Sequence, residues 1–341
     1  MARKAVLILN LGSPDSTSIP DVRKYLKEFL LDERVIDAHP VVRNLLVRGI
    51  ILPTRPKRTA AAYNKVWTDE GSPLILTSQN VQKKVQEQVE IPVELAMRYG
   101  SPSIPDAITR LKAQNIEKLF IMPMYPHYAM SSYETVLVRV QEELKIQAPE
   151  VTWTVLQPFY KDDDYINALV ESARPYITED LDKVLFSYHG VPERHMTKAD
   201  SSHAHCMITP DCCNVCHPAQ STCYRHQCFE TTKAMVHKLG LPLGKQAVAF
   251  QSRLTKEPWL RPFTDQVLEA FPEQGVKRIA VICPSFVTDC LETLEEIEME
   301  GREEFLAAGG EFFTMIPCLN EHPAWITMLA NRIRDWDASE E

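Results

Sequence analysis

The chain has 341 residues, of which 45% are hydrophobic and 24% charged, a composition typical of a globular protein of about two domains. Its net charge of −9, without a basic run, argues against nucleic acid as a partner. No apolar run reaches the roughly 18 residues of a membrane-spanning helix. The first apolar run is short and has no small-residue cleavage site after it, so we expect a cytoplasmic protein in a reducing compartment.

Apolar runs of strand length recur along the chain, and most are continuous rather than alternating, which favours strands buried on both faces. Helix-like segments at 104–115, 131–146, 230–239 and 289–307 separate several of them, which predicts parallel sheets covered by helices. The eight predicted strands are 5–12, 93–100, 118–126, 152–159, 183–190, 247–253, 278–286 and 311–319.

Four strands in each half of the chain indicate two similar lobes of an α/β fold. We place the first lobe at 1–160 and the second at 161–320, and expect a final helix at 321–341 that packs back on the first lobe. Ligands in such folds bind at the carboxyl ends of the strands. The chain has no G-x-G-x-x-G or Walker A loop, which argues against a dinucleotide or ATP enzyme.

His189 stands at the end of one predicted strand, in the sequence "FSYHGVPER". Histidine takes up and releases protons near neutral pH and also binds metals, so this position suits catalysis. A histidine that only bonds to the backbone at a turn is the alternative, and position alone does not separate the two.

Glu292, Glu296 and Glu300 recur at a spacing of four, so on a helix they form one stripe. The stripe is either a wet helix face, with Asp289 and Glu292 as a capping box, or a line of carboxylates for protons or hard divalent cations. From the spacing alone, the wet face is the better interpretation.

The motifs "LILNLGSPDS", "MRYGSP", "YPHY", "FSYHGVPER", "SRLTKEPWLRPFTD" and "CPSFVTDCLETLEEI" resemble those of ferrochelatases, from residue 5 to about 325. Members of that family insert ferrous iron into a porphyrin to make haem. The resemblance implies a type II chelatase-like fold, with two Rossmann-like lobes of parallel sheet, and ferrous iron and a porphyrin as substrates.

The resemblance also implies roles for individual residues. His189 matches the essential histidine and Glu292 the glutamate across the porphyrin face, both of them at the iron, with Glu296 and Glu300 as an acidic ladder behind. The implied porphyrin contacts are Arg55, Arg58 and Ser72 at the propionates, Arg98 and Tyr99 near the metal side, and Trp259 at the pocket boundary. Cys290 stands where some relatives have histidine, so histidine is not required there.

The apolar segment 41–58, "VVRNLLVRGIILPTRPKR", interleaves arginines with aliphatic residues. By itself it is an ordinary amphipathic helix and loop. The resemblance favours a pocket lip instead, and such a lip can also touch a membrane surface, which would make the protein peripheral at the inner membrane face.

Residues 203–223 form a cysteine-rich insertion, after which the chain rejoins the family pattern at Tyr224 and Cys228. Cys213 and Cys216 form a C-x-x-C pair, which lets two sulfurs reach one metal centre. Four thiolates suit a [2Fe–2S] cluster or a tetrahedral zinc ion.

Some ferrochelatases carry a [2Fe–2S] cluster on four cysteines, and we favour a cluster over zinc. The predicted ligands are Cys206, Cys213, Cys216 and Cys223, with Cys212 or Cys228 as alternates. A mixed zinc site stays open because four histidines lie among the cysteines: His203, His205, His217 and His226.

Protoporphyrin IX is the favoured substrate. The alternatives are coproporphyrin III, a related chelatase for cobalt or another divalent metal, and a two-lobed protein that senses iron or porphyrin without turnover. The long match through "EPWLRPFTD" and "DCLETLEEI" favours the iron enzyme.

Overall fold

The computed structural model describes residues 2–254 and 257–340. The chain divides into two compact units. The N-terminal unit comprises the chain up to Tyr125, Met130–Gln157 and the chain from Ile326 onward, and the C-terminal unit comprises Pro126–Ala129 and Pro158–Trp325.

The N-terminal unit contains a parallel four-stranded sheet of order β2-β1-β3-β4. Its strands are β1 (Lys4–Ser13), β2 (Val93–Gly100), β3 (Lys118–Pro123) and β4 (Thr152–Val155). The central strand β1 is almost wholly buried, as its continuous apolar run predicts, whereas the edge strand β4 leaves Trp153 43% exposed.

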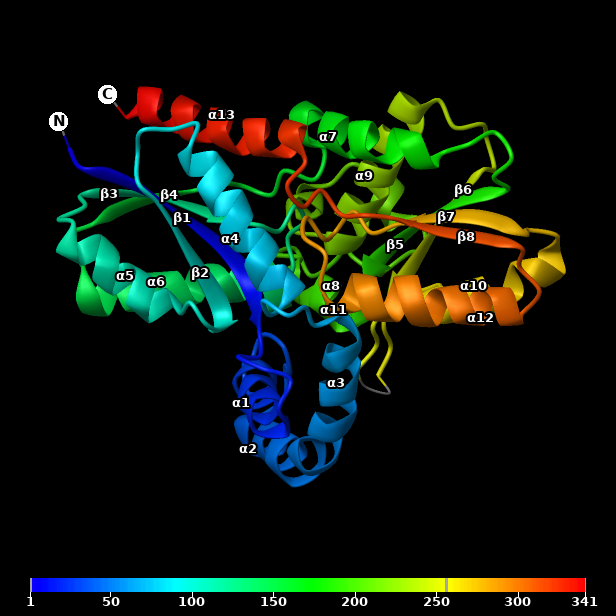
Figure 1. The fold of residues 1–341 in the computed structure, drawn as a ribbon, viewed down its shortest axis with the longest axis horizontal. Coiled ribbons are helices and arrows are strands. Elements are labelled where there is room, and N and C mark those ends of the chain that lie inside the picture. Colours follow the sequence, from blue (N-terminus) through cyan, green and yellow to red (C-terminus); the bar gives the residue numbers. More distant parts are fainter. Residues whose placement is uncertain (1, 255–256, 341) are drawn as a thin grey trace. The chain divides into compact units, whose positions relative to one another are not determined.

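Helices cover both faces of this sheet. Leu7 and Leu9 pack with Ile108 and Val140 in one core, and Figure 1 shows the helices α5 and α6 together on that side. On the other face Phe120 stacks on Trp336 of the last helix. The helices of this unit are α1 (Ile19–Leu30), α2 (Pro40–Asn44), η1 (Leu45–Ile51), α3 (Leu52–Val66), α4 (Pro73–Gln86), α5 (Ile104–Ala113), η2 (Met130–Glu134) and α6 (Thr135–Gln147), and the last helix is α13 (Pro323–Ser339).

Ion pairs tie the end of the chain to the N-terminal unit. Lys4 Nζ lies 2.7 Å from the Asp337 carboxylate, and Lys118 Nζ lies 2.7 Å from that of Glu340. The chain from Ile326 onward therefore belongs to the body of the first sheet.

The C-terminal unit repeats the same topology with the order β6-β5-β7-β8, again all parallel. Its strands are β5 (Lys183–His189), β6 (Gln246–Gln251), β7 (Arg278–Ile282) and β8 (Phe312–Ile316). The two four-stranded parallel sheets flanked by helices confirm the predicted α/β fold of two lobes.

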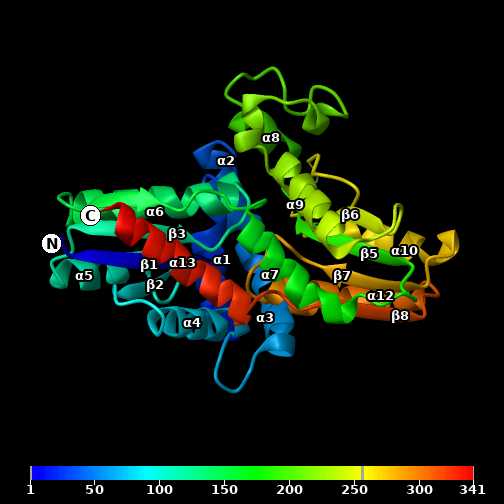
Figure 2. The ribbon, with the colours of Figure 1, turned by 90° about the horizontal axis from the view of Figure 1, so that it is seen from above.

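One face of this second sheet packs Leu185 and Val281 against Leu268, Ile297 and Phe305, which belong to α10 and the η7–α12 helix. Figure 2 shows α7 and α9 on the opposite face. The helices are α7 (Asp163–Ala173), η3 (Arg174–Tyr176), α8 (Glu193–Ala199), η4 (Cys212–Asn214), η5 (Pro218–Ser221), α9 (Tyr224–Leu239), α10 (Thr264–Ala270), η6 (Pro272–Gln274), α11 (Leu291–Thr293), η7 (Leu294–Gly301) and α12 (Arg302–Ala307).

Two predicted helices differ from regular α-helices. The segment predicted at 289–307 begins at Leu291 and widens to a π-helix over η7, and the one predicted at 131–146 begins with the π-helical η2. Apolar periodicity does not distinguish these forms, because both keep one face towards the sheet. Among the described residues, no helix is both long enough and apolar enough to cross a bilayer.

Candidate functional site

His189 is the last residue of β5, where the strand ends at the turn through Gly190. Its ring Nδ1 lies 2.6 Å from the carbonyl oxygen of Gly190, and its backbone N–H donates to Ser285 Oγ at 3.2 Å. A carbonyl only accepts hydrogen bonds, so Nδ1 carries the proton. The neutral ring therefore presents the lone pair of Nε2.

The turn after His189 requires glycine. Gly190 N–H donates to the Gln251 carbonyl at 2.6 Å, and a Cβ at residue 190 would lie 2.7 Å from that oxygen. The same Cβ position lies 3.5 Å from Cε3 of Trp259, which is only 6% exposed. Trp259 thus packs beside the turn that holds the histidine, and the ring centre of Phe286 lies 6.1 Å from that of His189.

The Glu292 carboxylate lies close enough to act electrostatically on His189. Burial lowers the pKa of His189, while the Glu292 charge and the Gly190 carbonyl raise it by less, so its pKa is lowered overall. His189 is therefore neutral at pH 7 and can accept a proton. The structure thus brings the two predicted central residues together within one unit.

Glu292 is not used to cap its helix, and the capping box of Asp289 and Glu292 is wrong. The N-cap is Cys290, whose partner is Thr293: the Cys290 N–H donates to Thr293 Oγ1 at 3.0 Å. Asp289 lies one residue earlier, where it accepts hydrogen bonds from Asn320 Nδ2 at 2.6 Å and Thr293 Oγ1 at 2.9 Å. The Glu292 carboxylate takes no part in this cap and instead accepts a hydrogen bond from the Cys290 thiol.

Glu296 is held by Ser252, which directly follows β6. The Ser252 N–H donates to Glu296 Oε1 at 2.8 Å, and its hydroxyl bonds to Oε2. Burial is the main reason that the pKa of Glu296 rises to about 7, and the nearby Glu292 charge adds to the rise. Glu296 thus exists in both protonation states near neutral pH.

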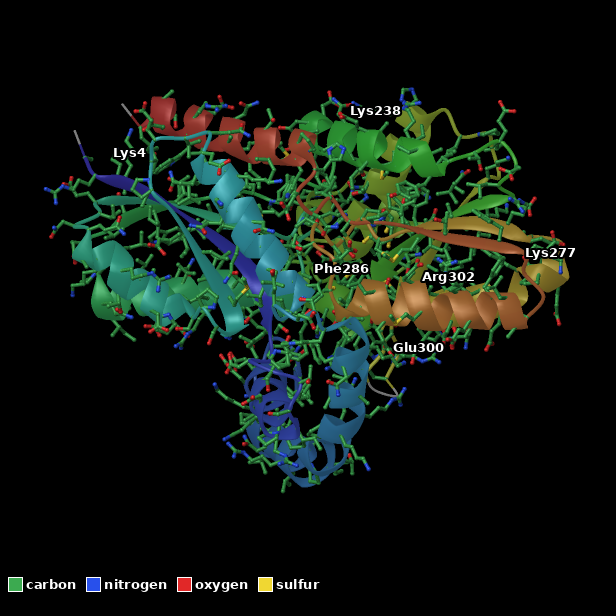
Figure 3. The ribbon with its side chains drawn as sticks, in the orientation of Figure 1. Lys4, Lys238, Lys277, Phe286, Glu300 and Arg302 are labelled. Carbon is green, nitrogen blue, oxygen red and sulfur yellow. The ribbon has the colours of Figure 1, made fainter. Side chains whose placement is uncertain are left out.

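Glu300 lies further along the same helix, where Figure 3 labels it. Its charge, with those of Asp265 and Glu269, raises the pKa of Glu304, for which burial is the first cause. Glu300 is half-buried within this group of carboxylates. The predicted stripe is therefore not uniformly wet, because Glu296 is bonded to Ser252 while Glu300 belongs to an acidic surface group.

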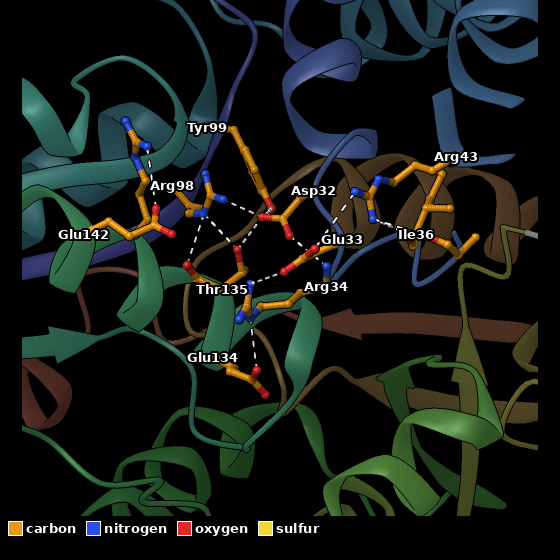
Figure 4. Close-up of polar contacts among 12 residues, drawn as sticks. Asp32, Glu33, Arg34, Ile36, Arg43, Arg98, Tyr99, Glu134, Thr135 and Glu142 are labelled. Atoms are coloured by element: carbon orange, nitrogen blue, oxygen red, sulfur yellow. Dashed lines mark hydrogen bonds and ion pairs between the residues drawn. The ribbon is translucent and has the colours of Figure 1, made fainter. Parts of the chain in front are cut away.

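In the N-terminal unit, Arg98 and Tyr99 form a network with Asp32 and Thr135 (Figure 4). Arg98 is paired with the Asp32 carboxylate, and its Nε donates to Thr135 Oγ1 at 2.8 Å. The Tyr99 hydroxyl donates to Asp32 at 3.0 Å, and the Arg98 guanidinium lies 4.4 Å from the Tyr99 ring centre. Tyr99 is fully buried, so it supports Arg98 rather than lining a surface.

Asp32 stays ionised in this network. Burial raises the pKa of Asp32, but hydrogen bonds from Thr135 and the Arg34 backbone, together with the Arg98 charge, outweigh burial and lower it. Asp32, Thr135 and Ser252 were not among the predicted site residues. Ser252 lies within the predicted strand 247–253, whereas the observed strand β6 ends one residue earlier, at Gln251.

The remaining predicted porphyrin contacts lie in the N-terminal unit. Arg55 and Arg58 are exposed on α3, three residues apart and so on one side of the helix, and Ser72 is the buried N-cap of α4. The predicted lip is helical from Pro40 to Val66 as α2, η1 and α3. It exposes Val41 (60%), Val42 (56%), Leu45 (68%) and Ile50 (62%).

The cysteine-rich insertion lies in the chain between α8 and α9, and Figure 2 shows it looping away from the sheet of its unit. The thiols of Cys206 and Cys213 both hydrogen-bond to that of Cys223. Cys223 is the N-cap of α9. The Cys213 thiol, the backbone N–H groups of His226 and Arg225, and the Cys206 thiol lower the pKa of Cys223 to about 6, against the effect of burial.

The other predicted ligands lie elsewhere in the insertion or below it. Cys216 is exposed, and the Cys212 sulfur lies 3.8 Å from an Arg225 nitrogen. Cys228 is fully buried and its thiol contacts Tyr224. In the part of the chain that the structure describes, no three His, Cys, Asp or Glu side chains are arranged to hold a metal ion.

Two of the histidines in this region are engaged with each other. The rings of His205 and His217 stack with centres 4.1 Å apart. His226 Nδ1 lies 2.9 Å from the Cys213 carbonyl, so it supports the loop. The Cys206 and Cys213 thiols each contact that of Cys223, and thiolates are the donors that soft metal centres use.

Comparisons with known proteins identify the family of the chain. A family model described as ferrochelatase matches residues 3–336. The chain is 56% identical over 340 residues to a protein named ferrochelatase from Opitutus terrae, covering 98% of both chains. It is 48% identical over 331 residues to a ferrochelatase from Pseudomonas fluorescens, covering 96% of this chain and 97% of the relative.

Solved structures with the same fold include SirB from Bacillus subtilis with Fe3+, which has a TM-score of 0.56 at 10% identity over 98% of this chain and 95% of that one. The cobalt complex of the sirohydrochlorin chelatase SirB from Bacillus subtilis subspecies spizizenii has a TM-score of 0.55 at 10% identity, covering 98% and 94%. At this identity the two structures support the fold alone.

Proposed function

Because the chain belongs to the ferrochelatase family and inserts ferrous iron into a porphyrin in haem biosynthesis, we propose that His189 and Glu292 perform the insertion. The observation that supports this is the contact of His189 Nδ1 with the Gly190 carbonyl, which leaves Nε2 as a base at the end of β5.

The reaction replaces two N–H protons of the porphyrin by one Fe2+ ion, so two protons must leave the centre of the ring. A planar porphyrin admits no metal while these protons are inside, and binding energy from the periphery of the macrocycle bends the ring. His189 Nε2 accepts a pyrrole proton. Glu292 provides a second acceptor and a hard oxygen donor for Fe2+ beside it.

Glu296 and Glu300 form the path behind Glu292. Glu296 exchanges protons near neutral pH, and Glu300 lies in the acidic surface group with Asp265, Glu269 and Glu304. Protons released at the porphyrin pass from Glu292 to Glu296 and then reach water through this group. The same carboxylates supply oxygen ligands for iron in transit.

We propose porphyrin contacts within each unit separately. In the C-terminal unit, Trp259 is packed beside the turn after His189 and is the proposed contact. Arg98 lies on the metal side, with Tyr99 and Asp32 holding it in place, and Arg55, Arg58 and Ser72 contact the propionates. Protoporphyrin IX is the substrate, since its apolar periphery suits the aliphatic side chains exposed on the lip helix.

The experiment compares His189→Ala with the unchanged protein in anaerobic assays with Fe2+ and either protoporphyrin IX or coproporphyrin III. A folded His189→Ala variant with the full rate would contradict the assignment of His189. Faster turnover of coproporphyrin III, or faster insertion of cobalt than of iron, would change the proposed substrate. The assignment of His189 and Glu292 to the site would stand.

The lip helix supports a second proposal, peripheral contact with the inner membrane face. Val41, Val42, Leu45 and Ile50 expose aliphatic surface, and Arg48 and Lys57 on the same helical segment can meet anionic lipid. Leu45→Glu should reduce cosedimentation with anionic vesicles. Unchanged cosedimentation would mean that the lip serves only the porphyrin.

The cysteine-rich insertion supports a third proposal, a [2Fe–2S] cluster on Cys206, Cys213, Cys223 and either Cys216 or Cys212. Such a cluster would supply a covalent cross-link for a loop with little regular structure. Inserting Fe2+ consumes no electron, so the role is structural or sensory. Cys228, buried beside Tyr224, serves as the matched control.

The test is the absorption spectrum with iron and sulfide content of the anaerobically purified protein. Cys223→Ser should lose the visible chromophore, and Cys228→Ser should keep it. A colourless protein with stoichiometric zinc would replace the cluster by a zinc site.

A further inference from the structure

Ser252 has a backbone conformation that usually belongs to glycine. It follows the last residue of β6 and has φ of +66°, in the left-handed region that side chains with a Cβ rarely adopt. Glycine would fit this turn with less strain. A serine here therefore indicates that its hydroxyl has a function that offsets the strain.

The hydroxyl and the N–H of Ser252 both point at one carboxyl group. The N–H donates to Glu296 Oε1 at 2.8 Å, and the hydroxyl bonds to Oε2. The left-handed turn lets one residue hold both oxygens. Ser252, which is 44 residues away in sequence, thus fixes the position of Glu296 from the turn after β6.

The neighbouring residue Gln251 holds the backbone of Glu292 through its side-chain amide. Its Nε2 donates to the Glu292 carbonyl at 2.6 Å, and its Oε1 accepts from Ser187 Oγ at 2.7 Å. In the sheet, Gln251 lies directly beside His189. The dipeptide 251–252 therefore ties Glu292 and Glu296 to the strand end next to the histidine.

A hydroxyl suits a carboxyl group that changes its protonation state. It donates to a carboxylate, and it accepts from the O–H of a carboxylic acid. The N–H of Ser252 only donates, so it serves the oxygen that never carries the proton. Both oxygens of Glu296 therefore keep a hydrogen-bond partner in Ser252 whether or not the carboxyl group carries a proton.

We propose that Ser252 is a positioning residue that holds the Glu296 carboxyl in one place in both protonation states, so that Glu296 can take a proton from Glu292. In this step an O–H bond of Glu292 breaks and one of Glu296 forms, and no electrons are lost. The proton then leaves to water at the acidic surface group. The inference rests on the proposed proton path through Glu296.

The test is Ser252→Gly, which keeps the N–H, relieves the left-handed strain and removes the hydroxyl together with its Cβ. We expect kcat for Fe2+ insertion to fall about tenfold, which is the size of a lost hydrogen bond to a charged group. Losing a bond that stabilises the carboxylate raises the pKa of Glu296 further, so the rising limb of the kcat–pH profile should move to higher pH. The melting temperature should be unchanged or higher.

Asn115→Gly is the matched control. Asn115 has φ of +54° in the N-terminal unit and is exposed, so its replacement relieves similar strain away from the site. It should leave kcat and the pH profile unchanged. If Ser252→Gly does not fold, Ser252→Ala, which keeps the Cβ and the N–H, replaces it in the same assays.

The double variant with Glu296→Gln separates the possible failures. If Ser252 acts through Glu296, adding Ser252→Gly to Glu296→Gln should lower kcat no further. An equal loss in that background, or a wild-type rate and profile for Ser252→Gly alone, would overturn the role of Ser252. A wild-type rate for Glu296→Gln would instead overturn the proton path itself.

Discussion

The two units hold buried carboxylates in opposite ways. Asp32 of the N-terminal unit is paired with Arg98 and stays ionised, with its pKa held below the ordinary value. Glu296 of the C-terminal unit has the Ser252 N–H and hydroxyl as partners, and its pKa rises to about 7. Two units with sheets of the same topology thus contain one carboxylate that is fixed in charge and one that can exchange protons.

This difference indicates what each network can do. An arginine–carboxylate pair stabilises a fixed geometry but cannot exchange protons near neutral pH, because arginine stays charged and the acid stays ionised. A buried acid held by serine costs stability when ionised but can accept and release protons. We therefore assign rigidity to the Asp32 network and proton movement to the Glu292–Glu296 side.

The largest expected effect is at the base next to Glu292. His189→Ala should lower kcat by about 10²- to 10⁴-fold, the usual contribution of a general base. His189→Asn keeps a donor for the Gly190 carbonyl but has no base, so it should be nearly as slow. Steady-state assays measure both variants.

Exposed His237 of α9 provides the control, since His237→Ala should keep the wild-type rate. Recovery of activity in His189→Asn would show that the histidine only shapes the turn.

The second effect tests the fixed charge. Asp32→Asn leaves the Arg98 guanidinium without its carboxylate and should destabilise the protein by about 3 kcal/mol in denaturant unfolding. The pair of Asp32 with Arg98 stabilises the folded protein fully at any pH above the ordinary aspartate pKa. This stabilisation is lost as the pH falls through the lowered pKa of Asp32 in the folded protein. In the Asp32→Asn variant, the free energy of unfolding should therefore fall less at acidic pH than it does in the unchanged protein.

Asp15→Asn breaks an exposed pair with Lys24 and should cost less than about 1 kcal/mol. If Asp32→Asn were as mild as this control, the Asp32 network would not be the rigid element proposed here.

The third effect tests the exchangeable proton. Glu296→Gln should lower kcat about 10²-fold, the low end of the usual contribution of one assisted proton transfer. The neutral form of Glu296 contributes stability that is complete below pH about 4.5 and is lost as the pH rises through about 7. Glu296→Gln should therefore melt at a higher temperature than the unchanged protein at pH 8, and this gain should disappear below pH 5.

Thermal unfolding at both pH values, together with the rate, distinguishes the two interpretations of the acidic stripe. A loss of stability without a loss of rate would return Glu296 to a purely structural role.

The smallest effect sharpens the geometry of the Asp32 network. Arg98→Lys keeps the charge but loses the planar fork that reaches both Asp32 and Thr135. It should destabilise the protein by about 1 kcal/mol and raise KM for the porphyrin more than it lowers kcat. An unchanged KM would remove Arg98 from the porphyrin-binding wall.

Strand positions were predictable because buried parallel strands need continuous apolar runs, and such runs are visible in the sequence. The ends of the strands were less predictable. The strands β3 and β7 end at Pro123 and Ile282, before the predicted ends, and Pro284 follows β7 closely. The helix cap was predicted wrongly because Asp289 is the better capping residue by type. In the folded chain Asp289 instead bonds to Asn320, 31 residues further on.

The sequence by itself determined the two α/β lobes and the place of His189 and Glu292 at the ends of their elements, since both depend on local patterns and motifs. Only the tertiary structure decided which acids hold a fixed charge and which exchange protons. That property depends on burial and on partners such as Arg98 for Asp32, 66 residues away, and Ser252 for Glu296, 44 residues away. Local sequence patterns contain no information about such distant neighbours, because only folding brings them together.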